Sequence, residues 1–243
     1  MFYFLKAEFW NSPSLVAMFV VSLVAVIFAR YLVVSIMYKV ILNLIARTLR
    51  NSFRKNFHQI KREIKWAFLS SIVFTVLCTI SLLLYQYNLT AIYTQVDEYS
   101  AIYFVLSPVL ILGLYETYYY WLHRWMHTPR IFKIVHKVHH ESLKPTVFTA
   151  FSFHPLEAFL QFLFFPLIII IIPIHLSMLG FVFALLTVCA VINHGGFEIY
   201  SAGIRKHVIG AGHHDRHHRD FRKNFGLTFT WWDKLMNTES LKE

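Results

Sequence analysis

Charged residues are scarce in this chain of 243 residues: Asp, Glu, Lys and Arg occupy only 15% of the positions, and hydrophobic types occupy 57%. This composition excludes an intrinsically disordered chain and argues against an ordinary soluble domain. The sequence also lacks internal repeats and low-complexity segments. A single membrane domain is the simplest interpretation.

Cysteines are equally few, because only Cys78 and Cys189 occur and both lie inside apolar runs. They are typical of small core residues, which argues against a disulfide framework and against a cysteine-based zinc site. We expect no cleavable signal peptide, because the first apolar run is too long and has no clear small-residue cleavage site.

Acidic residues number only 13 against 23 Lys and Arg, which gives a formal charge of +10. Such an excess is compatible with nucleic-acid binding. The basic residues, however, gather in short segments beside apolar runs, where they set membrane topology and meet anionic lipid. We therefore expect a membrane-embedded protein that does not bind nucleic acid.

Five apolar stretches approach the length of about 20 residues that spans a bilayer. They are Ser14–Val40, Trp66–Tyr87, Ala101–Leu122, Leu156–Ile174 and Leu176–Asn193. The short break at Pro173 and His175 predicts a tight helical hairpin over 156–193 that need not cross fully. The sequence thus predicts an all-α, multi-pass transmembrane bundle of four to five spans. Residues 1–112 would carry the first spans and a basic loop, and residues 113–243 a histidine-rich region.

Loop charges predict the orientation of this bundle. The loop between the first two spans is rich in basic residues: Arg47, Arg50, Arg54, Lys55, Lys61, Arg62 and Lys65. The positive-inside rule places this loop in the cytoplasm. Nearly all histidines then fall on the cytoplasmic side, as a helical cap on the bundle. The membrane would be a bacterial inner membrane or, in a eukaryote, the endoplasmic reticulum.

Histidines recur at fixed spacing in "HRWMH", "HKVHH" and "HDRHH". On a helix, residues three and four positions apart share a face, so we expect the three imidazoles of each HxxHH box to converge on one point. A basic patch for lipid headgroups would use Lys and Arg and would not need this spacing. The candidate ligands, with two single histidines added, are His123, His127, His136, His139, His140, His154, His194, His214, His217 and His218.

Ten candidate ligands predict two metal ions, because one ion takes four to six. Imidazole binds iron, zinc and copper, so the residues alone leave the metal open. Unbound, so many clustered imidazoles would carry a desolvation or charge cost. Isolated histidines such as His58, His175 and His207 are more typical of structural or solvent-facing positions.

Acidic neighbours of the boxes are further candidates. Glu116 lies seven residues before the first box and points about 20° from its first histidine. We interpret it either as an interhelical hydrogen-bond partner or as a group that contacts a ligand histidine or the substrate's polar group. Asp215 either orients His218, as carboxylates behind ligand histidines do, or pairs with Arg219.

The boxes, together with "FHPLEAF" and "HHDRHHRDFRKNFGLTFTWWDKLMNT", resemble the fatty acid hydroxylase superfamily of membrane di-iron enzymes. Within it the chain is similar to the sterol desaturase and sterol C4-methyl oxidase branch, over roughly Gly113–Thr238. The resemblance implies that the ten histidines ligate two Fe ions, which Zn can replace in purified protein. The irons would activate O₂ to hydroxylate or desaturate a sterol-like or fatty acyl lipid. His213 falls beside the site and is the less secure position.

The resemblance also implies a separate electron donor, either a cytochrome b5-like protein or a ferredoxin with its reductase. Basic residues near the boxes could dock an acidic carrier or form a solvated face: Lys133, Lys137, Arg216 and Lys223. The alternative is a non-redox zinc-dependent membrane protein. A hydrolase would need a general base such as Glu141 or Glu157, and a metal carrier would place its ligands along a path across the membrane.

Overall fold

The computed structural model describes residues 7–45 and 57–240, and these are mostly helical. The helices are α1 (Ala7–Trp10), α2 (Pro13–Ile45), α3 (Phe57–Gln86), α4 (Ala101–Met126), α5 (Pro129–Ile131), the π-helix η4 (Phe132–His136), α6 (Lys137–His140), the 3-10 helix η5 (Thr149–Phe151), α7 (Pro155–Ile171), α8 (Leu176–Asn193), α9 (Ala202–Arg205), α10 (Ala211–Asp220) and α11 (Trp231–Leu235). Strands β1 (Ile92–Tyr93) and β2 (Ile174–His175) pair in parallel. This short pairing, absent from the predicted all-α fold, ties the loop after α3 to the turn before α8.

Four helices, α2, α3, α4 and α8, are long and apolar enough to cross a membrane. Helix α7 is apolar but has only 17 residues. In α2 only 11% of the most apolar window is buried, so most of its apolar side chains face outward, as lipid contact requires. The prediction of a multi-pass helical membrane protein is confirmed. Four of the basic residues that predict its orientation (Arg47, Arg50, Arg54 and Lys55) lie outside the described residues.

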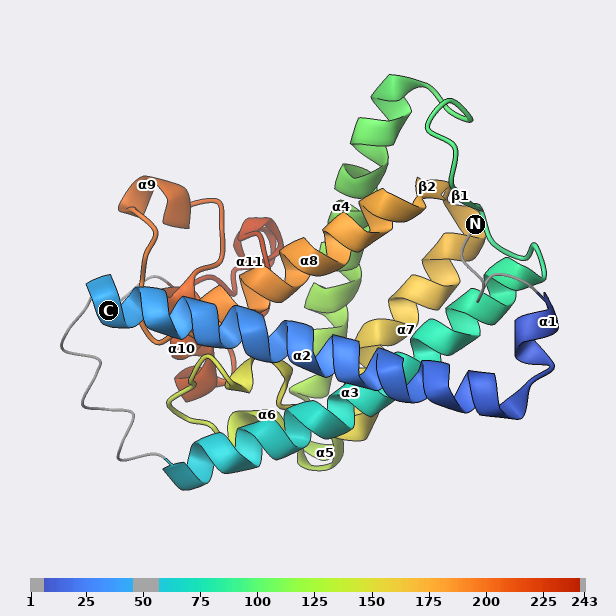
Figure 1. The fold of residues 1–243 in the computed structure, drawn as a ribbon. Coiled ribbons are helices and arrows are strands. Elements are labelled where there is room, and N and C mark those ends of the chain that lie inside the picture. The colour runs from blue at the N-terminus through green and yellow to red at the C-terminus, as the bar shows by residue number, and fades with distance from the viewer. Residues whose placement is uncertain (1–6, 46–56, 241–243) are drawn as a thin grey trace.

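The predicted hairpin of α7 and α8 is splayed, not tight. Helix α7 packs along α3, whereas α8 packs against α4 and α2, and the two diverge from β2 (Figure 1). Aromatic rings fill part of the space between them: Phe183 lies 5.5 Å from Phe162 and 4.6 Å from Phe165, measured between ring centroids. The two helices therefore meet through bulky aromatic rings.

The short histidine-bearing helices α6 and α10 gather at the end of the bundle where α2 ends and α3 begins, away from β1 and β2 (Figure 1). Long-range hydrogen bonds fix this end. The Tyr31 hydroxyl of α2 donates to the carbonyl of Phe148 at 2.7 Å. The buried carboxylate of Glu63 in α3 accepts from the hydroxyls of Ser142 and Thr149, at 2.7 and 2.8 Å. The loop after α6 is therefore tied to both membrane helices.

Candidate metal centre

Nine histidines form two groups, and within each group one ring nitrogen from every residue lies within 4.8 Å of the others. The five-histidine group contains His123, His127, His136, His140 and His217. The four-histidine group contains His139, His194, His214 and His218. All but His127 are buried. Residues 95 positions apart in the chain are thereby brought to one end of the bundle.

Each HxxHH box is shared between the two groups. In the box on η4 and α6, the first and last histidines join the five-histidine group and the middle one joins the four-histidine group. In the box on α10, the first and last histidines join the four-histidine group and the middle one joins the five-histidine group. Helical geometry explains the division, because positions i and i+4 point about 40° apart whereas i+3 and i+4 point about 100° apart. The prediction that each box converges on one point was wrong. The π-turn at Phe132–His136 leads into the first box.

Within each group, the Nε2 atoms are spaced as metal ligands are. In the five-histidine group the Nε2 atoms of His123 and His136 lie 3.0 Å apart, and in the four-histidine group those of His194 and His214 lie 2.9 Å apart. Imidazole nitrogens about 2.0–2.1 Å from a metal ion would lie about 3.0 Å apart at octahedral angles and about 3.4 Å apart at tetrahedral angles. The measured distances therefore suit ring nitrogens that would share one ion in each group.

The position of the proton on two of the rings also suits metal binding. The Nδ1 atom of His194 lies 2.6 Å from the carbonyl oxygen of Ala190, and that of His139 lies 3.4 Å from the carbonyl of Ser152. A carbonyl only accepts, so both Nδ1 atoms carry the proton and both neutral rings have a lone pair on Nε2. These two Nε2 atoms face each other at 3.3 Å. Facing lone pairs repel, and a cation between them removes the repulsion, so the donor set fits a metal ion.

Burial keeps the rings in the ligand form. It lowers the pKa of the six box histidines outside the membrane helices well below the ordinary value, with a further contribution from neighbouring imidazoles: His136, His139, His140, His214, His217 and His218. Burial also lowers the pKa of His194 to about 4. Neutral imidazole is the form that binds metal, so no ring must lose a proton at neutral pH.

A buried carboxylate stands behind the five-histidine group. Oε1 of Glu157 accepts from His136 Nδ1 at 2.8 Å and from the Gln161 amide at 3.0 Å. Such a pair fixes the tautomer and orientation of a ligand ring. Glu157 thus faces the ring nitrogen turned away from the group, and Glu141 pairs with Arg62 at 3.5 Å on the partly exposed surface. Neither acid considered as a hydrolytic base faces the Nε2 atoms that the grouped rings direct toward one another.

Two other buried carboxylates hold the backbone of residues 225–228. Asp233 accepts from the N–H groups of residues 225 and 226, at 2.9 and 2.8 Å. Glu116 accepts from those of residues 227 and 228, both at 2.9 Å. The carbonyl of Phe225 in turn accepts from His123 Nδ1 at 2.8 Å. Glu116 therefore reaches His123 only through the backbone of residues 225–228. Of its two expected roles, the hydrogen-bond partner between packed segments describes this contact, and direct contact with a ligand ring does not.

Gly226 is required at this point by the close approach of backbone and carboxylates. A Cβ atom there would lie 2.6 Å from the carbonyl oxygen of Phe229 and 3.1 Å from a carboxylate oxygen of both Asp233 and Glu116. The "NFGLTFTWWD" stretch therefore forms a backbone clamp, residues 225–228 held by Asp233 and Glu116, that orients the candidate ligand His123. The role of Asp233 was missed from the sequence, where the only signal was an acid following two tryptophans.

His154 is the one predicted ligand that the structure does not bring to either group. It is the N-cap of α7, where its Nδ1 accepts from the backbone N–H of Leu156 at 3.2 Å. Its ring lies 6.0 Å from that of Trp66. Because the ring turns back to cap its own helix, the structure brings together nine of the ten predicted ligands.

The two remaining candidates beside the boxes also lie outside the groups. Asp215 forms an ion pair with Arg219 at 2.8 Å, so the simpler of its two expected roles describes its position. His213 is buried, and its Nδ1 accepts from the backbone N–H of Gly210 at 3.4 Å. Both side chains therefore make contacts within α10 or at its N-cap.

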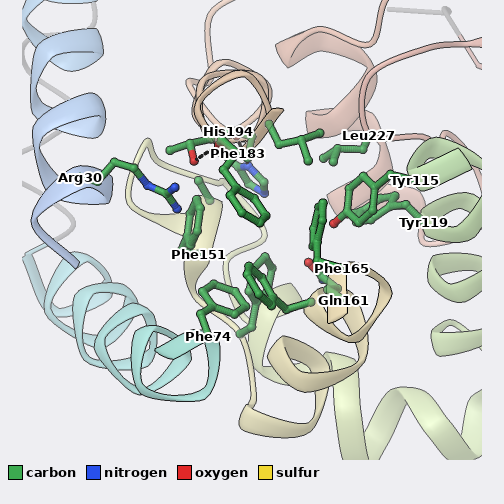
Figure 2. Close-up of a pocket in the computed structure, with 16 residues that line it drawn as sticks. Arg30, Phe74, Tyr115, Tyr119, Phe151, Gln161, Phe165, Phe183, His194 and Leu227 are labelled. Atoms are coloured by element: carbon green, nitrogen blue, oxygen red, sulfur yellow. Dashed lines mark hydrogen bonds between the residues drawn. The ribbon is translucent and has the colours of Figure 1, made fainter. Parts of the chain in front are cut away.

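An apolar cavity of ≈ 70 Å³ adjoins the centre (Figure 2). Its wall includes His194 of the four-histidine group and Tyr119, whose ring lies 5.2 Å from that of His123. Most of the other lining side chains are aromatic or aliphatic, and Arg30 of α2 points into the cavity (Figure 2). The arrangement places an apolar chamber directly beside candidate metal ligands.

The family model described as "Fatty acid hydroxylase" matches residues 108–238, a stretch that contains all nine grouped histidines. The chain is 30% identical over 181 residues to Delta(7)-sterol 5(6)-desaturase ERG3B of Gibberella zeae, covering 74% of this chain and 55% of that protein. It is 29% identical over 186 residues to lathosterol oxidase of Homo sapiens, covering 75% and 61%.

Methylsterol monooxygenase 1 of Rattus norvegicus is 35% identical over 140 residues, which cover 56% of this chain and 48% of that protein. The chain thus spans roughly half to just under two thirds of the length of the curated relatives it matches. No solved structure gives a significant match.

Proposed function

The chain belongs to the fatty acid hydroxylase family, and on that premise we propose that it is an O₂-dependent oxidoreductase that hydroxylates or desaturates a membrane lipid. The observation that carries the proposal is the pair of buried histidine groups beside an apolar cavity. Buried imidazoles at ligand spacing suit two metal ions, and an apolar chamber within a membrane bundle suits a lipid.

Nine histidines would hold the two ions, five around one and four around the other. We propose iron as the native metal, as in the family, with zinc as a replacement in purified protein. Iron bound there would supply the reduction of O₂ and the removal of hydrogen from an unactivated C–H bond, which yields an alcohol or an alkene. The chain itself fixes ring tautomers through backbone carbonyls and Glu157, and the wall of the adjoining cavity is mostly apolar.

The substrate proposed is a sterol-like or fatty acyl lipid. The printed names of the relatives refer to Delta(7)-sterol, lathosterol and methylsterol, and these names favour a sterol-like molecule for this chain too. The family match begins at residue 108, which agrees with a catalytic region over 113–243. We place the centre on the cytoplasmic face of the membrane.

Electrons would come from a separate carrier, cytochrome b5-like or a ferredoxin with its reductase. Lys133 and Lys137 are exposed on η4 and α6, the elements that carry the first HxxHH box. Their charge suits an acidic carrier that must approach the centre.

The test uses iron-loaded protein in detergent, supplied with a chemical reductant and a membrane lipid extract. We expect O₂ consumption that depends on the lipid, together with a lipid product that gains one oxygen or loses two hydrogens by mass spectrometry. The His194→Ala variant is the matched control and should show neither. Absence of lipid-dependent O₂ consumption in protein with two irons would overturn the proposal. Ester hydrolysis by zinc-loaded protein would instead favour the non-redox alternative.

A further inference from the structure

Helix α2 carries two charged residues within its apolar length, Arg30 and Lys39. Arg30 lines the inner cavity beside His194, and its side chain points into it (Figure 2). The rotation of α2 that directs Arg30 inward is fixed by the neighbouring Tyr31, whose hydroxyl donates to the carbonyl of Phe148 at 2.7 Å. The guanidinium is therefore held in the chamber by the fold.

No acidic side chain compensates this charge among the described residues. Arg30 is the one Asp, Glu, Lys or Arg residue in the described wall of the cavity, and no ion pair to it is found in the described part of the chain. Its Nε atom is buried without a hydrogen-bond partner. Charged groups within membrane helices are costly, and they are typically retained where they contact a substrate or an ion.

A second cavity, of ≈ 360 Å³, continues from the first toward the other end of the bundle. Phe162, Phe165 and Phe183 line both cavities, so these three rings form the boundary between them. The remaining wall of the outer cavity is almost wholly apolar and includes Leu82 and Leu179. An outer space of this size lies within the range of ligand pockets, whereas the inner one is too small for a whole lipid.

We infer that Arg30 binds an oxygen of the lipid substrate's polar group, hydroxyl or carboxylate, inside the inner cavity. The apolar remainder of the lipid then lies in the outer cavity, beyond the three phenylalanine rings. This arrangement places the oxidised carbon only a few bonds from the polar group, because His194 and Arg30 share one small chamber. The inference rests on the proposed function for the reaction, but not for the binding step.

Binding to purified, metal-loaded protein in detergent tests it, with paired probes that differ only in the oxygen. The pairs are cholesterol with cholestane, and stearate with octadecane. We expect the wild-type protein to prefer the oxygenated member of at least one pair, and Arg30→Met to weaken its binding by about tenfold or more, as loss of a hydrogen bond to a charged group does. Lys39→Met removes the other charge of α2 outside the cavity wall and is the matched control.

Two further variants distinguish a carboxylate from a hydroxyl as the polar group that Arg30 binds. Arg30→Lys keeps the charge and should preserve stearate binding, whereas Arg30→Gln keeps donors without charge and should preserve more of the cholesterol binding. Melting temperature and metal content establish that each variant is folded. The inference is overturned if Arg30→Met leaves every affinity unchanged, or if the wild-type protein prefers neither oxygenated probe. Protein that binds through Arg30 but consumes no O₂ would contradict the proposed function alone.

Discussion

The five-histidine and four-histidine groups differ in what holds their rings. In the five-histidine group, the Nδ1 acceptors of His136 and His123 come from distant segments, Glu157 of α7 and the carbonyl of Phe225, whereas His217 uses the nearby carbonyl of Lys223. In the four-histidine group the acceptors are backbone carbonyls, Ala190 for His194 and Ser152 for His139, and Nδ1 of His214 and of His218 are buried without a partner. The five-histidine group therefore has a carboxylate and a carbonyl 102 residues away behind its rings, whereas the acceptors found for the four-histidine group are backbone carbonyls closer in the chain.

The largest expected effect is the loss of a ligand from one group. His123→Ala and His214→Ala should each reduce turnover by more than about a hundredfold, because even partners behind the ligands cost 10–100-fold when removed. Each variant should retain one of two metal ions by elemental analysis. His154→Ala is the control and should retain both. Loss of both ions from either single variant would show that the groups are not separate centres.

Glu157→Gln tests whether the carboxylate distinguishes the five-histidine group. It removes the charge that faces His136 Nδ1, so metal affinity or turnover should fall by about 10–100-fold. Metal titration should show weakening of one ion only. Glu141→Gln, an exchange on the partly exposed surface, should leave both sites as they are. Equal weakening of both ions would contradict the assignment of Glu157 to one group.

The clamp over residues 225–228 offers a stability test of the same distinction. Gly226→Ala forces the backbone away from two carboxylates, and Asp233→Asn removes a charged acceptor from two buried N–H groups. A loss of about 2–3 kcal/mol would lower the melting temperature by roughly 5–10 °C for a chain of this size. Metal at the five-histidine group should be lost first, which spectroscopy of partly loaded protein can follow. An unchanged melting temperature in both variants would contradict a stabilising role for the clamp.

Asp215→Asn should have the smallest effect. Asp215 sits beside the four-histidine group in sequence, yet it pairs with Arg219 on the surface of α10. Exposed pairs of this kind contribute about 0.3–0.5 kcal/mol, so melting temperature should shift by less than about 2 °C. Turnover should stay within about twofold. A loss comparable to that of Glu157→Gln would mean that both groups have a carboxylate behind them.

The membrane helices and the histidine boxes could be predicted because their signals are local. Apolar length marks α2, α3, α4 and α8, and spacing marks the boxes. The division of each box between two groups could not be predicted by treating i+3 and i+4 as one face, since it depends on where the partner helices lie. His154 shared the residue type of a ligand, but its position as the N-cap of α7 directs its ring elsewhere.

The clamp over residues 225–228 could not be predicted from the sequence for a different reason. Glu116 and Asp233 are far apart in the chain, and each binds backbone N–H groups, which carry no sequence signature. The sequence marked Glu116 correctly as an acid within a membrane helix that needs a partner. It did not indicate which partner, because only the packed structure brings residues 225–228 to α4. The splayed arrangement of α7 and α8 could not be predicted either, because it depends on how Phe162, Phe165 and Phe183 pack between the two helices.

Anomalous X-ray diffraction from crystals of the iron-loaded protein, recorded at the iron edge, tests the central claim most directly. The account predicts two peaks, one within coordination distance of the Nε2 atoms of the five-histidine group and one within that distance of the Nε2 atoms of the four-histidine group. A single peak in fully loaded protein, or a peak coordinated by His154 or His213, would contradict it.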